Sequence, residues 1–186
     1  MLKGKRTGFL LLILLFSVCC HCPSQASIQQ DSVTYNGHSY AVLAGYGAPT
    51  FYQAYEDCKN AGGHLVTISS AREEKVVRNL AKNGGANWYW IGLAKTGNTW
   101  SWVDGSKVKY TYWANNAPAT KKNYAFMYGK SYRDSKKVKK AVGRWDSMSA
   151  YDPLFTSEEF YNENNGRILC EWDYVAGEAE PAITYP

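Results

Sequence analysis

The chain has 186 residues, of which 45% are hydrophobic, 20% charged and 15% aromatic. This is long and apolar enough for one domain with its own hydrophobic core. The formal net charge is +5, but the first 26 residues hold three of the 21 basic residues and none of the 16 acidic ones. The rest of the chain is therefore nearly neutral, which argues against nucleic acid as a partner.

The first 26 residues are typical of a secretory signal. Lys3, Lys5 and Arg6 form a positive start, residues 9–18 form a ten-residue apolar core, and small residues precede a cleavage point after Ala26. The apolar core is shorter than the roughly 20 residues of a membrane span, and we expect no transmembrane segment. We therefore predict a signal peptide over 1–26, a domain over 27–176 and a flexible tail over 177–186, in a secreted, extracellular protein.

The cysteines lead to two further expectations. A lipoprotein anchored through Cys19, Cys20 or Cys22 is the alternative to secretion, although residues 16–18 match a lipoprotein signal poorly. Beyond this segment the cysteines are Cys58 and Cys170, and an even pair in an exported chain predicts a disulfide. Closing a loop of about 110 residues would stabilise the fold by roughly 4–5 kcal/mol. Two buried free thiols are the alternative.

The N-terminal half predicts a hairpin and two helices. Residues 33–42 alternate as two short strands around Asn36-Gly37, a favoured hairpin turn. Thr50 with Gln53 makes a capping box. The helix that follows places Phe51, Ala54 and Cys58 on one face and stops at 62–63. After an extended segment at 65–68, Ser70 with Glu73 makes a second capping box. Its helix has an inner stripe of Val76, Val77 and Leu80 and ends at 83–85.

The C-terminal half predicts strands and loops. From Trp88 onward, short apolar and aromatic runs are interrupted by Gly, Asn, Asp and Pro. Residues 167–172 are typical of a last strand, with Ile168, Cys170 and Trp172 on one face by the two-residue period of a strand. Two early helices followed by an irregular β region predict an α+β domain.

The aromatic residues cluster strongly. Five of the seven tryptophans lie between Trp88 and Trp113, and we expect most of these rings to form the core of a domain with few regular elements. Together with their flanks, these residues resemble a C-type lectin-like domain over nearly the whole chain after residue 26. The resemblance is carried by Phe51 to Cys58, Gly62 to Val66, Ser70 to Leu80, Trp90 to Leu93, Trp100 to Ser106, Tyr112–Trp113, Trp145–Asp146 and Leu169 to Trp172.

The resemblance implies a fold and leaves the ligand open. Members of this family have two helices flanking small antiparallel sheets, with a long loop region that carries the binding surface. They bind glycans, proteins, lipids or ice, with or without calcium. The resemblance therefore implies an extracellular recognition module rather than a particular ligand.

Calcium is not expected at the family's sugar-binding position. Sugar-binding members hold the ion on a Glu-Pro-Asn or Gln-Pro-Asp triplet, a further acid and a Trp-Asn-Asp segment. This chain instead has Ala117-Pro118-Ala119 and Trp145-Asp146-Ser147, with Asn123 near the place of the further acid. One carboxylate is too few for a cation that takes six to eight oxygen ligands. A re-routed loop bringing in Asn115, Asn116 or Asp152 is the alternative.

Candidate ligand-binding residues follow from this loop and from a basic run. The loop candidates are the polar residues Asn115, Asn116, Asn123 and Asp146. A second candidate is a polyanion-binding patch formed by Arg133, Lys136, Lys137, Lys139 and Lys140. A solvated insertion loop without a ligand is the alternative for this basic run.

The sequence does not predict an enzyme. His38 and His64 stand beside a turn and after a helix stop, and we find neither a nucleophile motif, a phosphate loop nor zinc-site spacing. We predict a lectin-like module that binds an extracellular carbohydrate or glycoprotein through its long loops, without cofactor or metal. The alternative is a protein-interaction module or adhesin that uses the same surface. The oligomeric state is not indicated.

Overall fold

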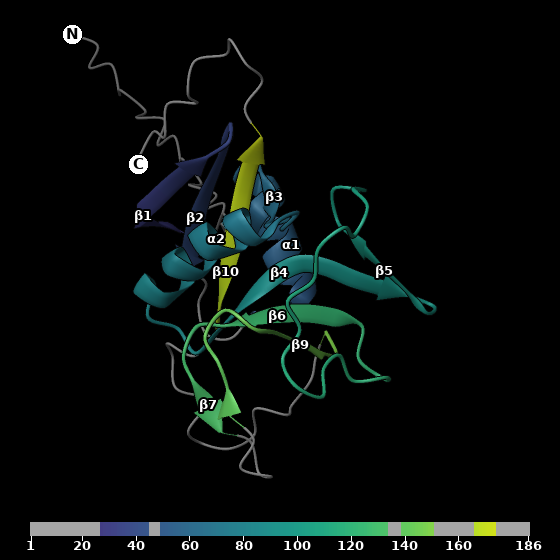
Figure 1. The fold of residues 1–186 in the computed structure, drawn as a ribbon. Helices are drawn as coiled ribbons and strands as arrows, with labels where there is room; N and C mark the ends of the chain where they lie inside the picture. Colours follow the sequence, from purple (N-terminus) through teal and green to yellow (C-terminus); the bar gives the residue numbers. More distant parts are fainter. Residues whose placement is uncertain (1–26, 45–48, 134–138, 151–165, 174–186) are drawn as a thin grey trace, which may run out of the picture.

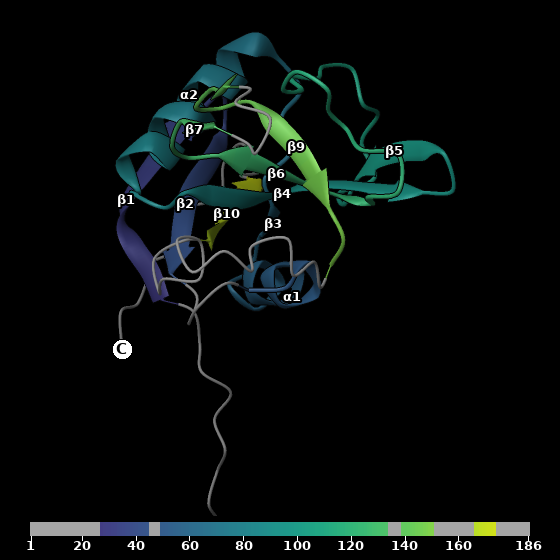
Figure 2. The ribbon, with the colours of Figure 1, turned by 90° about the horizontal axis from the view of Figure 1, so that it is seen from below.

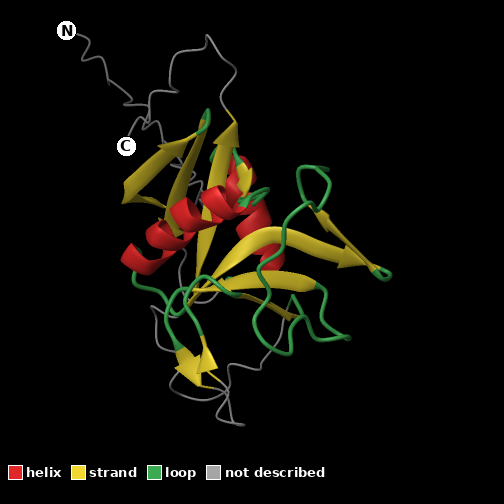
Figure 3. Cartoon of the chain, viewed as in Figure 1, coloured by secondary structure: helices red, strands yellow, loops and turns green. Residues whose placement is uncertain are grey.

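The computed structural model describes residues 27–44, 49–133, 139–150 and 166–173, which form two helices and ten strands (Figures 1 and 3). The helices are α1 (Phe51–Asn60) and α2 (Ala71–Asn83). The strands are β1 (Ser27–Tyr35), β2 (His38–Ala44), β3 (His64–Leu65), β4 (Trp88–Thr96), β5 (Thr99–Trp102), β6 (Tyr124–Tyr128), β7 (Tyr132–Arg133), β8 (Lys139–Lys140), β9 (Trp145–Met148) and β10 (Gly166–Asp173). Neither helix is long and apolar enough to span a bilayer. The predicted signal peptide and tail lie outside the described residues.

The first hairpin forms as predicted. β1 and β2 are antiparallel, and Tyr35 pairs with His38 across a two-residue turn. Asn36 and Gly37 have φ angles of 54° and 84°. Positive φ at both central positions is the geometry of a type I′ turn, which Asn-Gly accommodates because Gly lacks a Cβ.

Helix α1 also begins as predicted and is joined to the last strand. The Thr50 side chain accepts from the Gln53 N–H, and the Gln53 side chain accepts from the Thr50 N–H, so the capping box is complete. Cys58, on the buried face of α1, is bonded to Cys170 on β10, with Cα atoms 5.6 Å apart. The predicted disulfide is confirmed.

Helix α2 differs from the prediction at its first turn. The Ser70 side chain accepts from the Glu73 N–H at 3.2 Å, which is one half of a capping box. The Glu73 carboxylate does not return that bond, because it accepts instead from Ser69 and from Tyr40. The buried face carries Glu73, Glu74, Val77, Leu80 and Ala81, whereas Val76 is only half-buried.

The main sheet has the strand order β1-β2-β10-β4-β6-β9 and is mixed, where antiparallel sheets were expected. β10 is antiparallel to β2 and parallel to β4. The reason is topological. β2 and β4 run in opposite directions, and a strand inserted between two such strands must run parallel to one of them. The α+β class is unaffected by this difference.

The core has two layers, one on each face of this sheet. Figure 2 shows α2 and α1 on opposite sides of the strands. Trp88 and Trp90 of β4 belong to the cluster around α1, whereas Tyr89 and Ile91 belong to the cluster around α2. This alternation follows the two-residue period of a strand with both faces covered. Trp88, Trp90 and Trp102, three of the five tryptophans between Trp88 and Trp113, are buried, which confirms that most of these rings form the core.

The glycine of the Trp-Ile-Gly-Leu segment marks a close approach between chain segments. A Cβ at Gly92 would lie 2.6 Å from the carbonyl oxygen of Leu65. Gly92 also donates its N–H to Val66 and accepts from Val103. Only glycine lets β4 pass this close to the segment that follows β3.

Candidate functional site

The long loop between β5 and β6, residues 103–123, is held against β9. The Ala114 N–H donates to the Trp145 carbonyl at 2.7 Å, and the Trp145 N–H donates to the Tyr112 carbonyl at 2.9 Å. Further along, the Ala119 N–H donates to the Ser147 hydroxyl at 2.8 Å. The loop is therefore fixed at both ends of a short stretch, residues 114–119, while the side chains between can face solvent.

Aromatic side chains pack against the first part of this loop. The Trp113 ring lies 5.1 Å from the Trp100 ring and 5.9 Å from the buried Trp145 ring, measured between centroids. The Arg144 guanidinium stacks 3.8 Å above the Tyr112 ring. The edge-on Trp113–Trp145 pair and the cation over the Tyr112 ring each contribute about 0.5–1.5 kcal/mol, and the Trp100–Trp113 pair is tilted. These contacts hold the base of the loop in place.

Three of the four loop candidates are exposed side chains. Asn115 and Asn116 follow the Trp113 anchor, and Asn123 precedes β6. Asn116 has a φ angle of 63°, a conformation that asparagine tolerates better than most residues. The backbone carbonyl of Asn123 accepts from Lys95 at 2.7 Å, which fixes the point where the loop re-enters the sheet.

The fourth candidate, Asp146, is turned toward the protein. It is half-buried on β9, where it accepts from the Tyr128 hydroxyl at 2.9 Å and from the Ser147 N–H at 2.8 Å. The Ala119–Ser147 bond places residues 117–119 beside Asp146. The structure thus brings together the two segments that, by the family resemblance, correspond to those that hold calcium in sugar-binding members.

The residues at this position do not fit a calcium ion. The side chains of Ala117 and Ala119 are methyl groups, and the Asp146 carboxylate is already bonded to Tyr128 and to the backbone. A calcium ion takes six to eight oxygen ligands, several of them charged. Asp152, the alternative source of charge, lies outside the described residues. Calcium independence remains a prediction.

The structure describes only part of the basic run. Arg133 on β7 is paired with Lys139 on β8, and Tyr132 with Lys140, in a separate two-stranded sheet. The described backbone therefore brings three of the five candidates into one hairpin. Lys136 and Lys137 lie outside the described residues, and the polyanion-binding patch remains a prediction.

Three buried carboxylates were missed by sequence reasoning. Glu73, Glu74 and Glu171 are 6%, 3% and 2% exposed. Burial raises the pKa of Glu74, against the lowering effect of the nearby Arg78 and Arg144 guanidinium groups. Burial also raises the pKa of Glu171 to about 8. Glu171 follows Cys170 on β10, so the two-residue period of a strand places the two side chains on opposite faces. The face that carries Glu171 is buried because β10 lies in the middle of the sheet, and the sequence alone does not reveal that position.

Comparison with known proteins identifies the family. A model of the lectin C-type domain matches residues 48–153. The chain belongs to the C-type lectin domain family. One subunit of the snaclec salmorin of Gloydius brevicauda is 31% identical over 113 residues, covering 58% of this chain and 74% of that protein. One subunit of the snaclec coagulation factor IX/factor X-binding protein of Echis carinatus is 35% identical over 97 residues, covering 46% and 72%.

The fold agrees with this assignment. The solved structure of human lithostathine superposes with a TM-score of 0.57 at 21% identity, covering 82% of this chain and 99% of that one. The expected C-type lectin-like α+β fold, with its two helices, is confirmed. The chain is a C-type lectin-like binding module, and this is a family of non-enzymatic domains.

Proposed function

We propose that this C-type lectin-like domain is secreted and recognises an extracellular carbohydrate or glycoprotein through residues 114–123 and Asp146, without calcium. The proposal rests on the side chains found at the position where sugar-binding members of the family hold calcium. Ala117 and Ala119 have no side-chain oxygen to offer there, and the Asp146 carboxylate accepts from Tyr128 and Ser147. A ligand at this surface therefore binds the protein directly rather than through a bridging cation.

The chemistry of the exposed amides suits a hydroxyl-rich ligand. Each side chain of Asn115, Asn116 and Asn123 carries two N–H donors and a carbonyl acceptor, which match the mixed donor and acceptor character of sugar hydroxyls. The backbone anchors at Ala114 and Ala119 hold this stretch of loop before a ligand arrives. Preorganisation of this kind lowers the entropy lost on binding.

A protein partner is the second candidate for the same surface. The snaclec relative that is 35% identical is named for binding coagulation factors IX and X. The apolar methyl groups of Ala117 and Ala119, beside polar asparagines, are also compatible with the mixed character of a protein interface. On this alternative the domain binds no sugar.

A glycan array with and without a calcium chelator tests the proposal. We expect binding that the chelator leaves unchanged and that falls at least tenfold in the variant Asn115→Ala/Asn116→Gly/Asn123→Ala. Glycine at position 116 keeps the positive φ available, so that the backbone is not strained. Asn98→Ala, an exposed asparagine in the β4–β5 turn, is the matched control.

Two outcomes would overturn parts of this proposal. Sugar binding that disappears with the chelator would show that calcium takes part. A silent array would reject the carbohydrate interpretation. Cross-linking that captures a protein through the loop, and not in the Asn115→Ala/Asn116→Gly/Asn123→Ala variant, would then support the protein-partner alternative.

Secretion has its own test. We expect the protein in the culture medium to begin at Ser27, as determined by N-terminal sequencing. Incorporation of labelled fatty acid that is lost when Cys19, Cys20 and Cys22 are replaced by Ser would instead show the lipoprotein alternative.

A further inference from the structure

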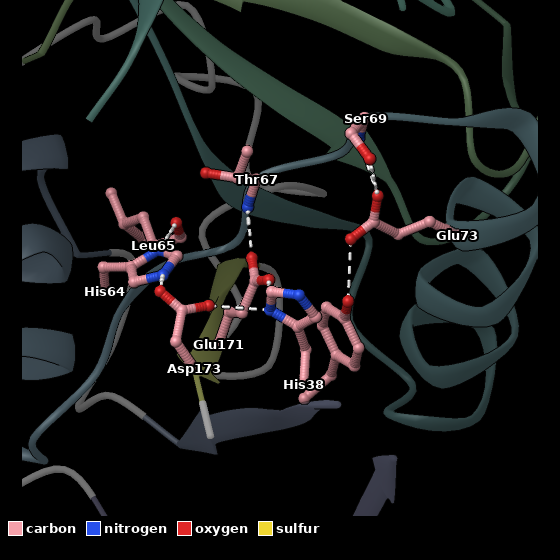
Figure 4. A network of polar contacts seen from close by, with 9 residues as sticks. His38, His64, Leu65, Thr67, Ser69, Glu73, Glu171 and Asp173 are labelled. Carbon is pink, nitrogen blue, oxygen red and sulfur yellow. Dashed lines mark hydrogen bonds and ion pairs between the residues drawn. The ribbon is translucent and has the colours of Figure 1, made fainter. Parts of the chain in front are cut away.

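Four polar side chains meet at one end of the main sheet, and none of them belongs to the proposed ligand-binding residues 114–123 and Asp146. His38 begins β2, His64 begins β3, and Glu171 and Asp173 lie at the end of β10. The register explains why they meet: β10 pairs Asp173 with His38 on one side and Glu171 with His64 on the other. Residues more than 100 positions apart are brought together by strand pairing (Figure 4).

The ligand atoms of three of these side chains lie close enough together to share one metal ion. His38 Nδ1 lies 2.7 Å from Asp173 Oδ1 and 2.9 Å from Glu171 Oε1. One ring nitrogen carries at most one hydrogen, yet two carboxylate oxygens converge on it. The ligand atoms of His38, Glu171 and Asp173 all lie within 4.8 Å of one another.

The neighbours of the cluster orient it. The Thr67 N–H donates to Glu171 Oε2 at 2.7 Å, which leaves Oε1 facing His38. His64 Nδ1 lies 2.9 Å from the Leu65 carbonyl oxygen, so that nitrogen must carry the hydrogen. The other ring nitrogen of His64, Nε2, lies 3.3 Å from Asp173 Oδ2 and holds that carboxylate as an N–H donor when both ring nitrogens carry a hydrogen. Supporting bonds of this kind surround metal ligands in proteins and fix their orientation.

The charges also favour a bound cation. The carboxylates of Glu171 and Asp173 both approach His38 Nδ1, at 2.9 and 2.7 Å, and Glu171 is only 2% exposed. A cation between these two carboxylates would offset their mutual repulsion.

We propose that His38, Glu171 and Asp173 bind a divalent transition metal ion of the zinc type, with His64 as a positioning residue that holds Asp173. A nitrogen ligand with two carboxylates suits a borderline ion better than calcium, which prefers oxygen ligands throughout. Three protein ligands leave a position for water, and the Asp173 side chain, which is 60% exposed, opens the site to solvent. The bound ion ties β2 to the end of β10.

Zinc alone is the probe for this proposal. The full chain is used with Cys19, Cys20 and Cys22 replaced by Ser, so that no thiol of the N-terminal segment competes, and metal is first removed with EDTA. Calorimetric titration is expected to give one Zn²⁺ per chain and a much weaker response to Ca²⁺ or Mg²⁺. Zinc at a hundredfold excess over its Kd is expected to raise the Tm by roughly 5–10 °C.

Variants separate this site from adventitious binding. His38→Gln and Asp173→Asn are each expected to weaken zinc binding by more than about 100-fold, and His64→Gln by about 10-fold. Glu56→Gln, an exposed carboxylate on α1, is the matched control and should bind as the parent does. Circular dichroism shows whether each variant is folded, and the exposed Asp173 is the position least expected to disturb the fold.

Imidazole NMR gives a readout that does not depend on affinity. Zinc is expected to shift the Nδ1 resonance of His38, because that is the atom facing the carboxylates, and to leave the Nδ1–H of His64 in place. Absence of zinc binding, or zinc binding that His38→Gln and Asp173→Asn leave unchanged, would overturn the proposal. Equal response to calcium and zinc would overturn the assignment of the ion.

Discussion

The two regions that carry polar candidates are built in different ways. Glu171 lies on a central strand with partners on both sides, and its carboxylate is fixed by the register of β10 with its neighbours. The asparagines of residues 114–123 lie on a loop that the sheet holds through a few backbone bonds. Changes at the strand end should therefore affect stability, whereas changes in the loop can alter the ligand and leave the fold intact.

The largest effect on stability is expected where the strand end is tied to α1. Replacing Cys58 and Cys170 by Ser removes a link across about 110 residues and should cost about 4–5 kcal/mol of unfolding free energy. Urea unfolding of the double variant and the parent measures this. If the double variant lost no more unfolding free energy than the loop variants do, the strand end and the loop would not differ in their importance for stability.

The next largest effect is expected at Glu73. Glu73→Ala leaves the buried Tyr40 hydroxyl without its acceptor and removes the acceptor of the exposed Ser69 N–H and hydroxyl, which should cost about 1–3 kcal/mol. Tyr40→Phe removes only one of these donors and should cost less. Urea unfolding compares the two, and a larger loss for Tyr40→Phe would contradict the role given to the carboxylate.

An effect that depends on pH is expected from Glu171. Its pKa of about 8 in the folded chain lies above the ordinary value of 4.5. The folded state therefore holds this proton more tightly than the unfolded state does. The contribution of Glu171 to the free energy of unfolding is therefore fully present below about pH 4.5. It is lost as the pH rises toward 8, by at most about 1.4 kcal/mol per pH unit.

Unfolding in EDTA across this pH range measures the effect without metal. The matched variant Glu171→Gln keeps the shape of the side chain and cannot ionise, so its stability should vary less with pH. His38 and the carboxylates of Glu73, Asp104 and Asp173 also lie near Glu171 and are unchanged in this variant. The same slope in parent and variant would show that Glu171 is not the group responsible.

The loop variants should have the smallest effect on stability. Asn115→Ala/Asn116→Gly/Asn123→Ala changes exposed side chains and is expected to alter the unfolding free energy by less than about 0.5 kcal/mol per site. The same variant should lose ligand binding. A large loss of stability would mean that the loop is part of the core after all.

The basic run can be tested by ligand binding, without a measurement of stability. Lys136→Ala/Lys137→Ala/Lys139→Ala/Lys140→Ala should elute from heparin at lower salt than the parent, because phosphate-like and sulfate groups are held by clustered cations. Removing the exposed lysines Lys59, Lys82, Lys107 and Lys121 changes the net charge equally and serves as the control. Equal behaviour of the two variants would favour the solvated loop.

Local signals in the sequence predicted much of the fold. The Asn36-Gly37 turn, the capping box of Thr50 and the buried face ending at Cys58 each depend on neighbours within one turn or one helix, and each is confirmed. The place of β10 between β2 and β4 depends on pairing between distant segments. No local pattern specifies it, and the mixed sheet was therefore missed.

The two candidate sites also differ in how far the sequence could predict them. The proximity of Ala117-Pro118-Ala119 to Asp146 was implied by the family resemblance, and the Ala119–Ser147 bond is in keeping with it. Local patterns place His38 and His64 only beside a turn and after a helix. Their meeting with Asp173 requires the register of three strands, which the residues themselves do not reveal.

The position of β10 also bears on how the domain is made. This strand, in the middle of the sheet, is the last of the described strands to leave the ribosome, so β2 and β4 must wait with unpaired edges until it has been synthesised. Exposed edges of this kind invite pairing with other chains. Folding of this domain should therefore be largely post-translational, and truncation before Gly166 should leave a sheet split into two halves that cannot close.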